Sequence, residues 1–153
     1  MVILVVIGIV PSFIVKNVVV NSYETRAVSI REVNLKNQCD ILGNQLMKEN
    51  YLREPDSDVI NGELSMLSAI YNGRILIINK DAKIIKDTYD IDVGKYALSE
   101  EVIQCFEGKS TANYDDKNAY IEMTSPITKM DSNTIEGVML VSISTSEIED
   151  SID

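Results

Sequence analysis

The sequence predicts an α+β fold in which a long N-terminal helix is followed by five β-strands and one short helix. Three observations support this fold class. About thirty residues near the N-terminus contain no proline and show helical apolar spacing. Five short apolar segments come after them, separated by turn-forming residues. Between the second and third of these segments lies a stretch with the start and stop signals of a helix.

Length and composition indicate one globular domain of ordinary size. The chain has 153 residues, of which 45% are hydrophobic and 25% charged. Its net charge is −10, and residues 56–153 hold 19 acidic side chains against 8 basic ones. Such an acidic domain would repel the phosphates of nucleic acid and the head groups of an anionic lipid surface. We therefore expect no nucleic-acid partner.

The first 20 residues carry a single charge, at Lys16. About 20 apolar residues span a bilayer, so we expect a transmembrane helix at residues 1–20, truncated if residues precede Met1. A cleaved signal peptide would need basic residues before the apolar run and small residues after it, and neither is found. A buried core segment is the other alternative. Basic residues after the segment favour a cytoplasmic location for the rest of the chain, a preference that basic residues upstream of Met1 would reverse.

Residues 21–54 are predicted to form the long, membrane-proximal helix. Its apolar positions recur at helical spacing and form one stripe: Val28, Leu35, Cys39, Leu42 and Leu46. The stripe would pack across a sheet, and its heptad-like spacing would also suit pairing with a second copy of the chain. Pro55 disfavours helix at Glu54 and ends the element.

The remaining elements occupy residues 55–145 in order. Residues 59–71 are helical or irregular, and strands are expected at residues 74–79, 83–88, 110–114, 119–127 and 136–145. The short helix at residues 100–107 has Ser99 as its N-cap and Gly108 as its stop. A further helix begins at Ser146 and runs to the end of the chain, residues 146–153, with Glu149 placed for a capping box.

The residue inventory argues against catalysis by this chain. It contains no histidine, so it cannot carry a phosphorylated histidine or a Ser/His/Asp triad. The segment EGKST resembles the end of a phosphate-binding loop, but the upstream glycine is replaced by Ile103. Cys39 and Cys105 form no metal-binding pair, and two buried thiols are favoured over a disulfide. We expect no metal and no cofactor.

Four stretches, in this order, resemble the extracytoplasmic PAS-like (single Cache or PDC) sensor domains of bacterial membrane-bound sensor histidine kinases. They are RILIINKDAKIIKDTY, VGKYALSEEVIQCFEGKS, YIEMTSPI and IEGVMLVSISTSEIE. One departure is the first turn, where Asp81-Ala82 stands in place of the usual Asp-Gly. The resemblance implies a five-stranded antiparallel PAS-like sheet with the long helix packed on it and the short helix crossing it.

The resemblance also implies a topology and a site. A membrane helix, an extracytoplasmic sensor domain and a second membrane segment would precede the dimerisation and kinase domains, with a homodimer formed through the long helix. A small-molecule or surface ligand would bind between the sheet and the crossing segment at residues 89–118. The candidate ligand-binding residues are Asp87, Tyr89, Tyr120, Glu122, Thr124, Met139 and Val141. Tyr89 and Tyr120 could instead be core-edge residues, and Glu122 a solvated edge charge.

The predicted function is signal sensing for a two-component histidine kinase, with movement of helices as the means of transmission. One alternative is the sensor domain of a chemoreceptor or cyclic-nucleotide enzyme. Another is a membrane-anchored surface-interaction domain without signalling output. Acidic groups at Asp90/Asp92, Asp115/Asp116 and Glu147/Glu149/Asp150 could attract divalent cations, although solvated loops explain them more simply.

Overall fold

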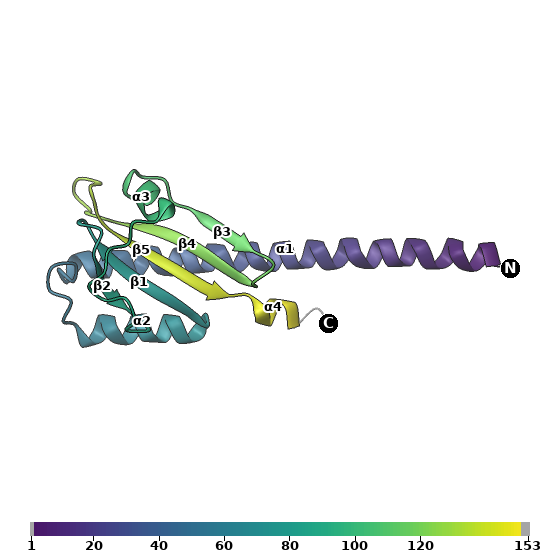
Figure 1. Cartoon of the computed structure of the whole chain (residues 1–153), viewed down its shortest axis with the longest axis horizontal. Helices are drawn as coiled ribbons and strands as arrows, with labels where there is room; N and C mark the ends of the chain where they lie inside the picture. The colour runs from purple at the N-terminus through teal and green to yellow at the C-terminus, as the bar shows by residue number, and fades with distance from the viewer. Residues whose placement is uncertain (1, 151–153) are drawn as a thin grey trace.

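The computed structural model describes the backbone of residues 2–150 and the side chains of residues 14–148. A long helix, α1 (Val2–Lys48), runs along the whole molecule and projects well beyond the rest of the fold (Figure 1). Its 47 residues correspond to a length of about 70 Å. The helix therefore joins the predicted apolar segment to the predicted long helix without interruption.

Helix α1 ends earlier than the sequence predicts. It stops at Lys48 rather than near residue 54, because Asn50 adopts a left-handed conformation with φ of 56°. The Tyr51 N–H then donates to the carbonyl oxygen of Leu46, and the buried Tyr51 hydroxyl donates to Asn61 at 2.6 Å. These contacts turn the chain back before Pro55, so proline does not set the end of the helix.

The predicted membrane segment lies mostly outside the described side chains, which begin at residue 14. Among the described residues, no helix is both long and apolar enough to cross a bilayer.

Helix α2 (Asp58–Ile70) comes after the turn and is capped by Ser57, whose hydroxyl accepts from the Ile60 N–H. A hairpin of β1 (Gly73–Asn79) and β2 (Ile84–Asp87) comes next. Its turn places Ala82 at φ 60°, the left-handed conformation that glycine usually occupies. The Asn79 side chain accepts hydrogen bonds from the Asp81 and Lys83 N–H groups, which stabilises the turn without a glycine.

The remaining elements are α3 (Glu100–Phe106), β3 (Ala112–Asp115), β4 (Tyr120–Thr128), β5 (Ile135–Ser144) and α4 (Ser146–Asp150). The predicted stop of α3 is confirmed, because Gly108 has φ of 89°. Ser99 occupies the N-cap position, but its side chain makes no capping hydrogen bond. The Glu149 side chain, needed for the predicted capping box of α4, lies outside the described side chains.

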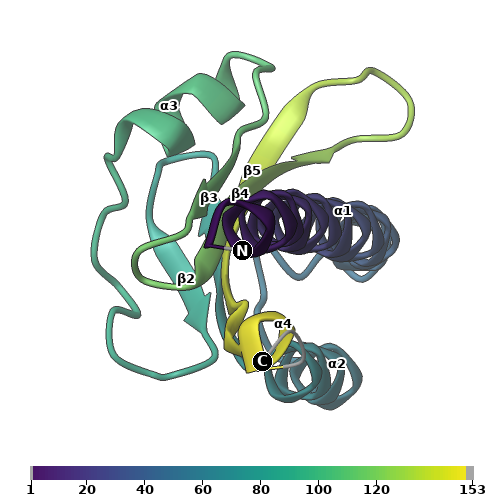
Figure 2. The same cartoon turned by 90° about the vertical axis from the view of Figure 1, so that its right-hand side faces the viewer.

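All five strands form one antiparallel sheet in the order β2-β1-β5-β4-β3. Helices α1 and α2 cover one face, and α3 covers part of the other (Figure 2). The predicted α+β fold, with a long helix on a five-stranded antiparallel sheet and a short crossing helix, is therefore confirmed.

The apolar stripe of α1 packs against the sheet within the same chain. Its five predicted positions are all buried, with at most 6% of each residue exposed. They pack with Ile75, Ile121, Met123 and other residues of the covered face. This stripe is therefore unavailable for pairing with a second copy.

The two cysteines are free, buried thiols on opposite faces of the sheet. Cys39 belongs to the core between α1 and the sheet, whereas Cys105 of α3 belongs to the core on the other side. Burial raises the pKa of the Cys39 thiol to about 12, so this thiol is protonated and unreactive.

Candidate functional site

A row of polar side chains crosses the sheet on the face opposite α1. Strand register places Arg74 of β1, Ser142 of β5, Glu122 of β4 and Asn113 of β3 directly opposite one another. Residues that pair directly across antiparallel strands point to the same face. We call these four residues the polar row.

The polar row lies beside the part of the face that α3 covers. Helix α3 packs through Val102 and Cys105 on Leu76, Ile78 and Val138, which lie further toward the β4–β5 turn. In Figure 1, α3 sits near that turn, and the ends of β1, β4 and β5 nearest the termini lie beyond it. Arg74, Glu122 and Ser142 are half-buried and Asn113 is exposed, so solvent reaches the row.

Asp87 binds Arg74, the residue at one end of the polar row. Its side chain is fully buried, and its two oxygens accept from Nε and Nη2 of Arg74 at 2.9 and 2.5 Å. The same carboxylate accepts from the backbone N–H groups of Tyr89, Ile91 and Asp92 at 2.9–3.0 Å. Asp87 therefore fixes both the Arg74 guanidinium and the start of the loop at residues 88–99.

Hydrogen bonds keep both Asp87 and Arg74 in their charged forms. Burial alone would raise the pKa of Asp87, but the bonds from Arg74 and from three backbone N–H groups outweigh it and hold the pKa well below its usual range. The hydrogen bond to Asp87 raises the pKa of Arg74 further above its ordinary value. Both groups are thus ionised at all physiological pH values.

The loop after β2 adds a second acid and an aromatic ring to Arg74. Asp92 accepts from Arg74 Nη2 at 2.7 Å and from Lys95 Nζ at 2.6 Å. Hydrogen bonds from Lys95 and Arg74 lower the pKa of Asp92. The Tyr89 ring lies with its centroid 5.8 Å from the Arg74 guanidinium carbon, and half of the residue is exposed. Asp92 thus acts as an ion-pair partner, because its carboxylate is already engaged by two cations.

Beyond Tyr89 and Asp92, the crossing segment runs along the outer edge of β2. Ile84 forms two backbone hydrogen bonds with this segment: its carbonyl accepts from the Gly94 N–H, and its N–H donates to the Lys95 carbonyl. The Ala97 N–H donates to the Ala82 carbonyl. An isolated bridge joins Lys83 to Tyr96. These bonds hold the segment beside the sheet, which leaves the middle of the polar row uncovered by it.

Five of the seven predicted site residues lie on the face of the polar row. Asp87 pairs with Leu76, and Tyr89 comes shortly after it in the loop. Tyr120, Glu122 and Thr124 alternate along β4 on that face. Thr124 is buried, and its hydroxyl accepts from the Thr111 N–H at 2.9 Å. Glu122 accepts from the Ser142 hydroxyl at 3.3 Å and is half-buried. The structure therefore brings these five residues to one side of the sheet.

Met139 and Val141 lie on the other face. Val141 pairs with Met123 and Met139 with Ser125, and both are fully buried in the core beneath α1. The residues of β5 that share a face with Glu122 are Leu140 and Ser142. Side chains alternate between the two faces along each strand, but the relative register of β4 and β5 is not encoded in either strand alone. Met139 and Val141 therefore do not share a face with the polar row.

Sequence reasoning missed Arg74, Ser142 and Asn113. Arg74 is the one charge within the buried strand that starts at Gly73, which is a weak signal of a specific partner. Ser142 and Asn113 become informative only through register.

The acidic pair Asp115/Asp116, a cation candidate in the sequence, forms part of a turn. Asp115 accepts from the N–H groups of Lys117 and Asn118 and from the Asn118 amide. Those hydrogen bonds lower the pKa of Asp115. They also show that its carboxylate stabilises the turn.

Comparison with solved structures finds 25 chains of similar fold. The extracellular domain of vpHK1S-Z8, a predicted histidine kinase, superposes with a TM-score of 0.64 at 12% identity over 94% of this chain. The sensor domain of DcuS from E. coli gives 0.56 at 12% identity over 78%. The ligand-binding domain of the Campylobacter jejuni chemoreceptor Tlp3, solved in complex with L-valine, gives 0.53 at 14% identity over 87%.

Coverage differs among these structures. This chain spans 95% of the DcuS chain but only 63% of vpHK1S-Z8 and 60% of Tlp3. No family model matches the sequence, and no curated protein matches it significantly. At these identities the likeness concerns the fold. The chain has the fold of the sensor domains of histidine kinases and chemoreceptors, which confirms the resemblance to PAS-like sensor domains at that level.

Proposed function

We propose that the chain is the extracytoplasmic signal-sensing domain of a membrane-bound sensor histidine kinase. The observation that carries the proposal is the polar row. Arg74, Ser142 and Glu122 stand on three adjacent central strands, on a part of the sheet that α3 leaves uncovered. Antiparallel sheets often have one solvated polar face, but here the buried Asp87 fixes the Arg74 guanidinium in one position. A charged group held in this way beside Ser142 and Glu122 is suited to ligand recognition.

The row favours a small zwitterionic ligand such as an amino acid. The contacts of Arg74 to Asp87 and Asp92 use Nε and Nη2, which leaves Nη1 without a partner among the described residues. Nη1 can donate to a ligand carboxylate, and Glu122 can accept from a ligand ammonium. Ser142 lies between the two and can bond to either. The solved chemoreceptor Tlp3 with L-valine or isoleucine is an example of the same fold with an amino acid bound.

The signal from the ligand would pass to the contact between α1 and α4. Arg31 of α1 lies 3.8 Å from the Glu147 carboxylate of α4 and 5.4 Å from the Tyr71 ring centroid. Ile148 of α4 is buried in the core that α1 covers. A ligand that binds two arrangements of the sheet and α1 with different affinity would change the position of α4 relative to α1.

The homodimer is proposed to form through a second stripe of α1. Val19, Tyr23, Ile30 and Val33 have coiled-coil spacing and are each at least 55% exposed. Polar residues Arg26 and Asn37 occupy the other positions of the same heptad pattern. This stripe differs from the one that packs on the sheet, so a helix pair and the internal core can coexist.

A chemoreceptor is the second candidate output, because Tlp3 shares the fold with comparable scores. The experiment that separates the two is the nucleotide sequence of the gene on both sides of this segment. A histidine kinase predicts a second apolar stretch of about 20 residues, then a helix with a phosphorylatable histidine and an ATP-binding domain. A long methyl-accepting coiled coil without that ATP-binding domain would contradict the kinase and support the chemoreceptor. A reading frame that ends near Asp153 would contradict both.

A further inference from the structure

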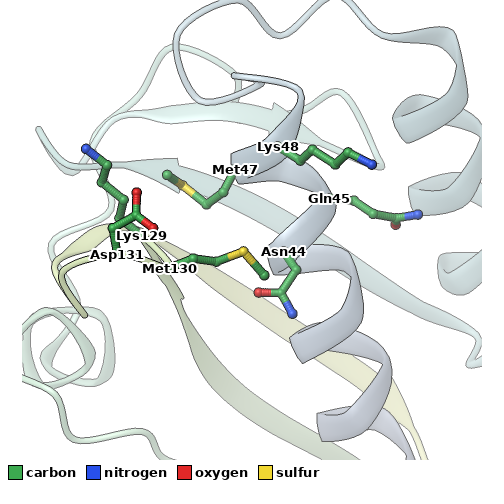
Figure 3. Close-up of a pocket in the computed structure, with 7 residues that line it drawn as sticks. All are labelled: Asn44, Gln45, Met47, Lys48, Lys129, Met130 and Asp131. Carbon is green, nitrogen blue, oxygen red and sulfur yellow. The ribbon is translucent and has the colours of Figure 1, made fainter.

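A pocket unrelated to the polar row lies at the end of the molecule opposite the termini. It has a volume of about 390 Å³ and lies between the last turns of α1 and the β4–β5 turn. Most of its lining surface is apolar, although five of its seven lining residues are polar or charged. Met47 extends from α1 toward the β4–β5 turn, and Met130 extends from that turn toward α1 (Figure 3). Pockets of this size with apolar walls and a few polar groups are typical small-molecule sites.

A second, more polar hollow of about 290 Å³ adjoins the first. The two share Met47 and Lys129 as lining residues, and the second adds Arg53, Glu136 and Asn50. Because they share these two side chains, the apolar pocket and the polar hollow lie next to each other, and we call the two together the groove. An amphiphile with an apolar tail and a polar head group matches this division.

The charges of the groove favour an anionic head group. Lys48, Arg53 and Lys129 line it, and none of the three forms an ion pair among the described residues. Asp131 and Glu136 also lie there, so the lining keeps one net positive charge on a chain whose net charge is −10. The Arg53 guanidinium and the shared Lys129 flank the polar hollow, and an arginine fork suits a carboxylate.

The tail would contact adaptable side chains. Met47 is half-buried, whereas Met130 is 74% exposed at the tip of the turn. Unbranched methionine side chains fit around apolar ligands of varied shape. A tail between them would cover the exposed Met130 side chain and contact α1 and the β4–β5 turn at once.

We propose that this groove binds an amphiphilic carboxylate, with its alkyl tail between Met47 and Met130 and its carboxylate beside Arg53 and Lys129. The site goes beyond the proposed sensing face, since it uses the opposite side of the sheet and the far end of α1. Binding there does not depend on the polar row. A ligand in the groove would bridge α1 and the sheet, the two parts whose relative position the proposed signalling changes.

The test is a titration of the chain, labelled with ¹³C at its methionine methyl groups, with sodium octanoate. The chain has six methionines. Met47 and Met130 report on the groove, and the buried Met123 and Met139 are internal controls for the fold. We expect saturable shifts of the Met47 and Met130 signals with octanoate, and at least tenfold weaker binding of octanol and octylammonium.

Variants separate the head-group contact from general hydrophobic association. The double substitution Arg53→Gln and Lys129→Gln should weaken octanoate binding at least tenfold. Lys80→Gln, at an exposed lysine of the β1–β2 turn, should leave it unchanged. Unaltered Met123 and Met139 signals would establish that each variant is folded.

Three outcomes would overturn the proposal. Equal binding of octanol or octylammonium would exclude recognition of the carboxylate. Non-saturable shifts at all methionines would indicate non-specific association. The absence of any octanoate-dependent shift at Met47 and Met130 would exclude the site itself. Glu122→Gln, a change in the polar row, should leave the octanoate affinity unchanged, so the two sites are tested separately.

Discussion

Asp87 is a buried carboxylate whose ion pair and backbone hydrogen bonds hold together the hairpin, the loop after it and the polar row. Removing one partner of a fully buried charge pair costs about 3–5 kcal/mol. The loss here should lie at or below the lower end of that range, because Arg74 is half-buried and keeps Asp92 as a partner. We expect Asp87→Asn to lower the free energy of unfolding by a few kcal/mol at pH 7. The exposed Asp116→Asn should change it by less than about 0.5 kcal/mol.

The same pair predicts a pH dependence with a defined sign. The pKa of Asp87 is lower in the folded chain than the value of about 4 in the unfolded chain. Its contribution is therefore complete above about pH 4 and is lost as the pH falls toward the folded pKa. The stability difference between wild type and Asp87→Asn, measured by urea unfolding, should narrow between about pH 4 and about pH 2.5. A constant difference over that range would contradict the assigned pKa direction.

Gly73 is required by close packing of strands β1 and β5. A Cβ atom there would meet the Ser142 carbonyl and the side chain and Cα of Ile143 at distances that real Cβ atoms do not adopt. We expect Gly73→Ala to destabilise the fold by at least about 2 kcal/mol, as overpacking does. Gly62→Ala is the matched control, since its Cβ would meet nothing within 4 Å and it lies within α2. That change should stabilise the chain by about 0.5–1 kcal/mol. Similar effects of the two changes in thermal unfolding would argue against the strand contact.

At the level of single residues, the sequence predicts which positions are polar within apolar strands but not their partners. Asp87 and Glu122 are found in this way. Their neighbours Arg74 and Ser142 come from strands that are distant in sequence, and only the register places them together. Shifting the register of a strand by one residue exchanges its two faces, so the sequence alone does not show that Met139 and Val141 lie on the face opposite the polar row.

At the scale of elements, α1 carries two distinct apolar stripes. The buried stripe is predicted by its regular spacing, and its role against the sheet is confirmed. The exposed stripe is interrupted by Arg26 and Asn37, so its pattern is weaker. The exposed stripe can be recognised only in the structure, where the sheet covers the other side of the helix and leaves these apolar residues in solvent. The sequence misplaces the end of α1 because Asn50, rather than Pro55, changes the chain direction.

The contact of α1 with α4 depends on Arg31. The Arg31 guanidinium lies 3.5 Å from the Tyr71 carbonyl and 3.8 Å from Glu147, and its buried Nε has no hydrogen-bond partner among the described residues. We expect Arg31→Ala to loosen α4 and to speed hydrogen exchange of the Thr145 and Ile148 amides. These amides donate to the Ala119 and Thr145 carbonyls. Asn34→Ala, an exposed change on the same helix, should leave their exchange unaltered. Equal hydrogen-exchange rates of these amides in the two variants would show that Arg31 does not hold α4 against α1.

At the scale of the whole molecule, the exposed stripe of α1 predicts self-association. Ile30 is 55% exposed near its middle. Sedimentation equilibrium of the chain should give a dimer, and Ile30→Glu should shift it to monomer by placing like charges in the helix pair. Val59→Glu, on the exposed side of α2, is the control and should leave the dimer intact. A monomer at all concentrations, or a dimer that survives Ile30→Glu, would contradict pairing through this stripe.

The fold as a whole arises from local patterns that agree with one another. Strand and helix order, the hairpin and the crossing helix are all visible in the sequence because each has its own periodicity and turn residues. The proposed ligand site is less visible, since its residues come from five strands and one loop. The groove at the far end of α1 has no sequence signal, because it arises from the meeting of a helix end and a distant turn.

The most direct test of the proposed sensing function is isothermal titration calorimetry of this chain against the twenty amino acids. We expect at least one to bind saturably, and Glu122→Gln to weaken that binding at least tenfold, or about 1.4 kcal/mol. The exposed Glu54→Gln should leave the affinity unchanged. Binding that is indifferent to Glu122→Gln would contradict the polar row as the site. The absence of binding by any amino acid would contradict the zwitterionic ligand on which the proposed sensing function is built.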